Sequence, residues 1–65
     1  MKLTINGEPR EVAARTLLGL LEELGLEPKS IVVERNATIL DRNLYQEILL
    51  SEGDVLELVR IVGGG

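Results

Sequence analysis

The sequence contains no cysteine, no histidine, no tryptophan and no phenylalanine, and Tyr45 is its only aromatic residue. Without cysteine the chain has no disulfide, no thiol nucleophile and no thiolate ligand for a metal ion. Without histidine it has no imidazole base, so any catalysis would rest on carboxylate, hydroxyl or amine groups. We therefore expect a chain that is not an enzyme and that binds no metal or cofactor itself.

The carboxylates that remain do not form a catalytic set. Glu22 and Glu23 are adjacent, and on a helix their side chains diverge by about 100°. Glu8 and Glu11 flank a predicted hairpin strand, so solvated surface positions explain all four residues. The glycines at 63–65 are not a phosphate-binding loop either, because such a loop opens a helix and none follows here.

Positive charge is scarce as well. Eleven acidic residues stand against seven basic ones, which gives a formal charge of −4. Nucleic acids and anionic membranes are bound by clusters of lysine and arginine, so we expect neither as a partner. No apolar run reaches the length needed to cross a bilayer and no signal segment opens the chain, so we expect a cytoplasmic protein. A basic surface on a partner protein fits the negative charge best.

What the sequence does contain is aliphatic. It has 65 residues, of which 45% are hydrophobic, and almost all of these are Leu, Ile, Val or Ala. A chain of this size buries only about 60% of the surface that its unfolded form exposes, which leaves no room for a deep pocket. We predict one domain over residues 1–62, followed by a flexible glycine tail at 63–65.

The segment 54–62 is the most informative one. Its apolar residues occupy both faces of a predicted strand, which is typical of a central position in a sheet. One face carries Leu56 and Leu58, and the other carries Val55, Val59 and Ile61.

Three glycines, Gly63, Gly64 and Gly65, follow this strand directly. Because they have no Cβ, the tail can lie in a narrow channel, and it reaches roughly 10 Å beyond the fold. A frayed end is the alternative interpretation. We predict that the carboxylate of Gly65 is the group that the chain presents to another protein.

The remaining elements follow from periodicity and turn residues. Residues 1–5 alternate as a half-buried strand, and Asn6-Gly7 predicts a hairpin turn with a returning strand at 10–13. Thr16 is a predicted N-cap, and the helix after it ends at Gly25. Its buried stripe is predicted to be Leu17, Leu20, Leu21 and Leu24.

The second half of the chain predicts three more strands. Residues 30–35 and 38–40 flank a turn at Asn36-Ala37, and 54–62 forms the last strand. Between them, the segment 41–51 is expected to cap the core through Leu44, Ile48 and Leu49. One helix against one sheet then places the first and last strands side by side in the middle, parallel to each other.

Several segments together resemble the ThiS family of sulfur carrier proteins. The resemblance covers almost the whole chain, and its most specific parts are the Gly53-Asp54 turn, the strand after it and the glycine end. Two departures lie in a turn and a short strand, where Ala37 replaces a common glycine and Asp41 a common proline. The matching segments are Leu3-Thr4-Ile5-Asn6-Gly7, Thr16-Leu17, Val33-Glu34-Arg35-Asn36, Ile39 to Arg42, Gly53 to Val59 and Val62-Gly63-Gly64-Gly65.

The resemblance implies both a fold and a function. The fold would be α+β, a β-grasp (ubiquitin-like) fold with a mixed sheet of about five strands packed on one main helix. The carboxylate of Gly65 would be adenylated with ATP by a ThiF-like adenylyltransferase, and a sulfur donor protein would convert it to a thiocarboxylate. That thiocarboxylate would supply sulfur to thiazole synthase in thiamine biosynthesis, and the ATP would be used by the partner enzyme.

Other functions remain open on the sequence alone. Within sulfur carriers, the small subunit of molybdopterin synthase usually has prolines before its diglycine, and Arg60-Ile61-Val62 has none. A covalent modifier of the ubiquitin type would form an isopeptide with a lysine instead of a thioacid. A non-covalent β-grasp binding module would have no use for a free carboxylate after Gly64.

A partner also needs a contact beyond the tail, because ordering each backbone residue costs about 1–2 kcal/mol. Because the helix covers one face of the sheet, the other is a candidate docking face. The alternatives are ordinary surface aliphatics or burial under the segment 44–50. Candidate partner-binding residues are Val55, Val59 and Ile61 on this face, with Arg60 and Arg42 at its rim.

Overall fold

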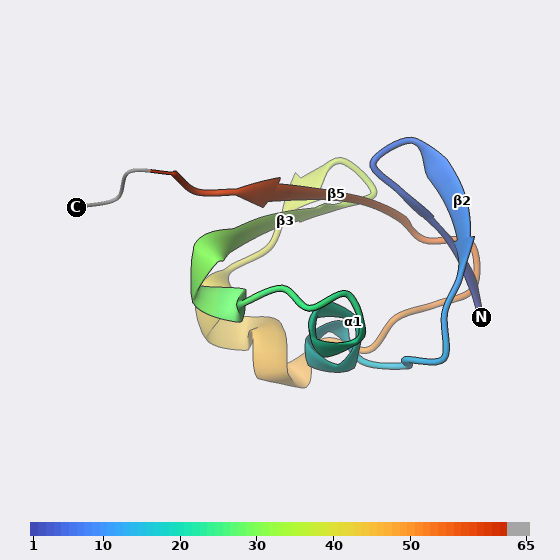
Figure 1. The fold of residues 1–65 in the computed structure, drawn as a ribbon, viewed down its shortest axis with the longest axis horizontal. Coiled ribbons are helices and arrows are strands. Elements are labelled where there is room, and N and C mark those ends of the chain that lie inside the picture. Colours follow the sequence, from blue (N-terminus) through green and yellow to red (C-terminus); the bar gives the residue numbers. More distant parts are fainter. Residues whose placement is uncertain (63–65) are drawn as a thin grey trace.

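The structure, a computed structural model, describes residues 1–62; the predicted glycine tail at 63–65 lies outside the described residues. Five strands form one mixed sheet in the order β2-β1-β5-β3-β4, and the helix crosses one of its faces (Figure 1). The elements are β1 (Lys2–Ile5), β2 (Glu8–Glu11), α1 (Leu17–Glu23), η1 (Pro28–Ser30), β3 (Ile31–Arg35), β4 (Thr38–Ile39), η2 (Arg42–Glu47) and β5 (Val55–Arg60), where η denotes a 3₁₀-helix.

The prediction that the first and last strands are parallel neighbours in the middle of the sheet is confirmed. β1 pairs with β5 in parallel, with Thr4 opposite Val55 and Ile5 opposite Leu56. On its other side β5 pairs antiparallel with β3. The core lies between the sheet and α1, and its fully buried aliphatic side chains are Leu3, Leu17, Leu20, Leu21, Ile31, Val33 and Leu56.

The helix begins and ends at the predicted residues. The Oγ1 atom of Thr16 accepts a hydrogen bond of 3.0 Å from the backbone N–H of Gly19, which satisfies one of the free donors of the first turn. Gly25 has a φ of +72°, the left-handed conformation that ends a helix most easily when no side chain is present. Of the predicted leucine stripe, only Leu24 is less than fully buried.

The predicted returning strand at 10–13 is displaced, because β2 is Glu8–Glu11. Asn6 and Gly7 have φ values of 51° and 83°, so they form a two-residue turn and pairing resumes at once. Glu8 therefore lies opposite Ile5. Pro9 lies in this edge strand, as predicted from its missing N–H.

The segment 41–51 differs most from the prediction. It contains the 3₁₀-helix η2, in which Tyr45 is buried, while Leu44 and Leu49 are 47% and 67% exposed. The prediction that these two leucines cap the core is wrong. A 3₁₀-helix has three residues per turn, so a short one directs only one position per turn inward. In η2 the inward position is occupied by Tyr45.

The hydroxyl of Tyr45 takes the place of a missing strand. β4 pairs with Glu34 and Arg35, and the N–H of Leu40 adds one bond to the carbonyl of Val33, so the edge of β3 before that carbonyl has no neighbouring strand. The Tyr45 hydroxyl donates to the carbonyl of Ile31 at 2.9 Å and accepts from the N–H of Val33 at 3.1 Å. One side chain thus satisfies two backbone groups on this buried edge.

Candidate functional site

β5 anchors the predicted tail through its ladder with β3. Its ladder with β3 continues past the strand itself, because the N–H of Ile61 donates to the carbonyl of Ser30 at 2.8 Å. The next residue, Val62, is 85% exposed and is the last one that the structure describes. Figure 1 shows β5 leading out of the body of the molecule, away from the end that holds the N-terminus. The predicted sites Gly63, Gly64 and Gly65 are thus joined to a strand that is held up to Ile61.

The beginning of β5 is fixed by a buried carboxylate. Asp54 is 6% exposed and accepts hydrogen bonds from Ser51 N–H at 2.8 Å and from the Asn36 side-chain amide at 3.3 Å. Arg35 completes the set with an ion pair of 2.9 Å. The amide oxygen of Asn36 also accepts from the N–H of Val55. From the sequence we predicted only that Asp54 lies in a turn. The one local indication of this network is an acidic residue directly before an apolar strand.

The face of the sheet opposite the helix is open. Val55, Val59 and Ile61 are 46%, 57% and 45% exposed. The helix η2 packs against α1, on the other side of the sheet, so the segment 44–50 does not cover these residues. We call this surface the open face. Strand alternation adds side chains from β3 and β4, and a shallow hollow in it is lined by Val32, Glu34, Ile39, Glu57 and Val59.

Two carboxylates lie within this apolar surface. Glu34 of β3 and Glu57 of β5 are directly opposite each other in the antiparallel ladder. Like charges in such a pair destabilise a sheet, and no ion pair to either residue occurs within residues 1–62. The open face therefore combines exposed aliphatic side chains with a local negative charge that a basic group would neutralise.

The two candidate arginines do not lie at the rim of the open face, contrary to the prediction. Arg60 follows Val59, and because successive side chains of a strand alternate, it lies on the helix side, where it lines a hollow with Leu58. The Nη2 atom of Arg42 donates to the carbonyl of Ile31 at 3.2 Å. Since Ile31 lies opposite Arg60, both arginines are at the end of the sheet from which β5 leaves.

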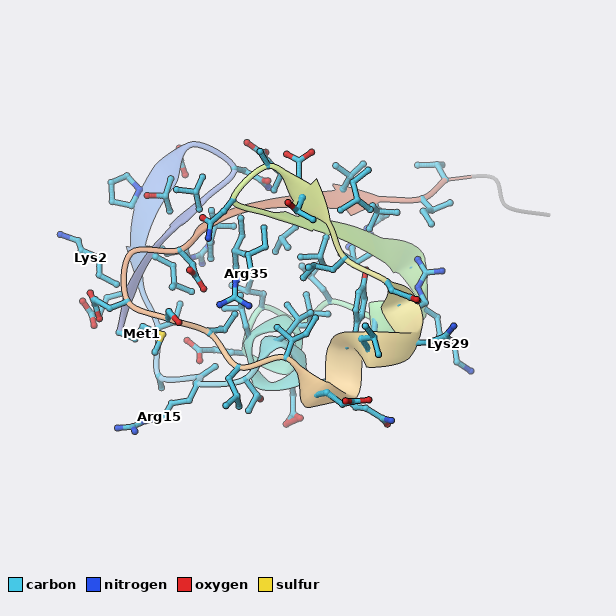
Figure 2. The ribbon with its side chains drawn as sticks, turned by 180° about the vertical axis from the view of Figure 1, so that it is seen from behind. Met1, Lys2, Arg15, Lys29 and Arg35 are labelled. Atoms are coloured by element: carbon cyan, nitrogen blue, oxygen red, sulfur yellow. The ribbon has the colours of Figure 1, made fainter. Side chains whose placement is uncertain are left out.

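Within residues 1–62, no three acidic side chains gather closely enough to hold a metal ion. Among the helices in these residues, none could span a lipid bilayer. Figure 2 shows the labelled basic side chains Lys2, Arg15 and Lys29 spread around the periphery, without a common cluster.

Comparisons with known proteins agree with this geometry. The chain is 44% identical over 66 residues to a thiazole synthase of Paramagnetospirillum magneticum, but it spans only 20% of that protein. It is 44% identical over 50 residues to the sulfur carrier protein ThiS of Bacillus subtilis, which covers 77% of the chain and 76% of the relative. The crystal structure of the thiamine biosynthesis protein ThiS of Geobacter metallireducens matches along both whole chains, with a TM-score of 0.83 and 30% identity.

This structural match confirms the predicted β-grasp fold with its mixed five-stranded sheet and one main helix. The family model described as the ThiS family matches residues 3–65, nearly the whole sequence. The chain belongs to the ThiS family.

Proposed function

We propose that the chain is a sulfur carrier of thiamine biosynthesis whose acceptor group is the carboxylate of Gly65. The observation that carries this proposal is β5, a central strand between β1 and β3 that is followed within two residues by three glycines. The family assignment supports it, since the relative in Bacillus subtilis is named a sulfur carrier protein. In this proposal the chain is not an enzyme, because it supplies only the acyl group.

The chemistry requires an activating partner. A terminal carboxyl group has a pKa near 3.3–3.7, so it is ionised at neutral pH and its carbon resists nucleophilic attack. A carboxylate oxygen of Gly65 would attack the α-phosphate of ATP on a ThiF-like adenylyltransferase, and pyrophosphate would leave. Sulfide (HS⁻) released by the donor protein would then attack the acyl carbon, AMP would leave, and loss of the proton would give a thiocarboxylate on Gly65.

The open face is the proposed docking surface for the partner enzymes. Ordering the tail costs about 1–2 kcal/mol per residue, and burial of Val55, Val59 and Ile61 would offset that cost. A lysine or arginine of the partner would lie between Glu34 and Glu57 and remove their repulsion. The net charge of −4 also favours a partner surface that is positively charged.

We propose thiazole synthase as the enzyme that receives the sulfur. This proposal is supported by a protein of that name in Paramagnetospirillum magneticum, which contains a region similar to the entire chain. Both the activation and the transfer would take place in the cytoplasm, where ATP is available.

Intact mass spectrometry tests the proposal. The chain is incubated with ATP, its cognate adenylyltransferase and a sulfur donor, and we expect the mass change of one oxygen replaced by sulfur. The matched control lacks Gly64 and Gly65, keeps all of the described residues and should stay unmodified while giving an unchanged circular dichroism spectrum. An unchanged mass of the full chain beside a partner that adenylates another substrate would contradict the proposal. A covalent adduct on a lysine of another protein would indicate a modifier instead.

Docking through the open face has its own test. Val59→Asp places a charge on that face beside Glu57, and we expect the affinity for the adenylyltransferase to fall at least about tenfold. The control is Leu49→Asp, which changes another exposed aliphatic residue away from this face. Equal affinities of the two variants would remove the open face from the proposal while leaving the chemistry of Gly65 intact.

A further inference from the structure

β5 extends beyond the end of β1, and this leaves part of one edge without a neighbouring strand. The pairing of the two strands ends at Ile5 and Leu56. Asn6 continues it by one step, because its N–H donates to the carbonyl of Leu56 and its Oδ1 accepts from the N–H of Leu58 at 2.8 Å. Beyond that point β5 has no strand on this side.

The direction of the backbone groups shows which of them are left free. The N–H of Ile61 donates to the carbonyl of Ser30, which directly precedes β3, and the N–H of Asn36, which directly follows β3, donates to the carbonyl of Val55. The backbone N–H and C=O groups of odd-numbered residues in β5 therefore point toward β3, and those of even-numbered residues point toward the opposite edge. It follows that the carbonyl of Leu58 and both backbone groups of Arg60 have no partner within residues 1–62.

A groove lies beside this free edge. It is an open hollow of about 440 Å³ whose lining includes Leu24, Leu26 and Leu58, all partly buried, and the guanidinium-bearing Arg10 and Arg60. Arg10 comes from β2 and Arg60 from β5, and both are exposed. We call this surface the edge groove.

The arginines of the edge groove are not neutralised by the described part of the chain. The ion pairs within residues 1–62 join the Met1 amino group to Glu11 and Arg35 to Asp54. Glu23 also lines the hollow, but its carboxylate accepts hydrogen bonds from the N–H groups of Ala13 and Ala14. The edge groove thus offers two cationic groups beside one hydrogen-bonded carboxylate, an apolar floor and unpaired backbone groups.

We propose that the edge groove binds an extended segment of the adenylating partner, which adds a short strand beside Leu58–Arg60. The backbone of that segment would accept from the N–H of Arg60 and donate to the free carbonyls, as in other cases of strand addition. An acidic side chain would pair with Arg10 and Arg60, and an apolar one would cover Leu58. This inference rests on the proposed function, because the partner that it names is the activating enzyme.

The two surfaces of the chain would then recognise opposite charges. The open face carries Glu34 and Glu57 and fits a basic group, whereas the edge groove carries Arg10 and Arg60 and fits an acidic one. Such a pair of surfaces admits only one orientation of the chain on its partner, because the reversed orientation brings like charges together. It would set the direction in which the residues after Val62 enter the partner.

Amide hydrogen exchange tests the free edge. In the free chain, we expect the Arg60 amide to exchange near the unprotected rate while Ile61, which bonds to Ser30, stays protected. Saturation with the cognate adenylyltransferase without ATP should slow the Arg60 amide at least about tenfold. Protection of Arg60 in the free chain would overturn the inference, and so would protection that appears only in a dimer of this chain.

Charge reversal tests the arginines. We expect Arg10→Glu and Arg60→Glu each to weaken binding to the adenylyltransferase about tenfold. The control is Arg15→Glu, which makes the same change at an exposed residue near the N-terminal end of the molecule (Figure 2). Equal affinities of all three variants would overturn the inference.

The outcomes separate the inference from the proposed function. If the wild-type chain is adenylated while its Arg60 amide stays unprotected, the proposed function is supported and the proposed role of the edge groove is overturned. If the wild-type chain binds with Arg60 protected but gains no sulfur, the proposed function is overturned and the role of the edge groove is supported. No measurable binding of the wild-type chain would overturn both.

Discussion

Removal of the Tyr45 hydroxyl tests how the bare edge of β3 is stabilised. In Tyr45→Phe the N–H of Val33 loses the acceptor of its 3.1 Å bond, and the carbonyl of Ile31 keeps only the bond from Arg42. A buried donor without a partner costs about 1–3 kcal/mol, so we expect a loss of about 2 kcal/mol in the free energy of unfolding. A domain of 65 residues has about 3–10 kcal/mol in total.

Urea unfolding of the wild type and the variant measures this difference. We expect a lower midpoint at an unchanged m value, because the surface exposed on unfolding stays the same. The thermal midpoint should fall by about 8–16 °C, since a domain of this size shifts by about 4–8 °C per kcal/mol. The amide of Val33 should also exchange faster in the variant than in the wild type.

Two further variants test whether the Tyr45 hydroxyl is responsible for this loss of stability. Gln46→Ala changes an exposed neighbour in η2 and should stay within about 0.5 kcal/mol of the wild type. Arg42→Met should cost more in the Tyr45→Phe background than alone, because only the double variant leaves the carbonyl of Ile31 without a donor. A loss below about 0.5 kcal/mol for Tyr45→Phe, or strictly additive effects of the pair, would show that the hydroxyl does not act as described.

Three other predictions concern the core, a turn and the glycine tail. Leu21→Ala should lower the free energy of unfolding by about 2–5 kcal/mol in a denaturant melt, because Leu21 is fully buried; a change under about 0.5 kcal/mol would contradict its place in the core. Ala37→Gly should raise that free energy by about 0.5–1 kcal/mol, because Ala37 has a φ of 72°, whereas Ala13→Gly, at a residue without positive φ, should lower it. Gly64→Val should slow ATP–pyrophosphate exchange about a hundredfold with stability within about 0.5 kcal/mol, and wild-type exchange would remove the tail from the mechanism.

The elements that periodicity defines were predictable from the sequence. The helix from Thr16 to Gly25 has a capping residue, a leucine stripe and a glycine stop, all of which act within a few residues of chain. The central place of β5 follows in the same way from apolar residues on both of its faces. Of the two alternatives that the sequence left open for Val59, exposure is the one that occurs, because the single helix covers only the other face of the sheet.

The features that depend on contacts between distant segments were not predictable. Tyr45 is buried because β4 is too short to cover β3, and no pattern around residue 45 reports the length of another strand. Arg42 was predicted at the rim of the open face, but its position depends on the same uncovered edge at Ile31. The family resemblance, by contrast, came from short segments and indicated a role for Gly65 that no periodicity could have supplied.

The position of β5 between two strands has a mechanical consequence for any enzyme that holds the end of the chain. A pull along β5 loads its hydrogen bonds to β1 and β3 in shear, because those bonds run across the strand direction. They must yield together, whereas bonds at a peeling edge yield one after another. A partner could therefore draw on the residues after Val62 with considerable force, and the strand would transmit that force to the whole domain before it came loose.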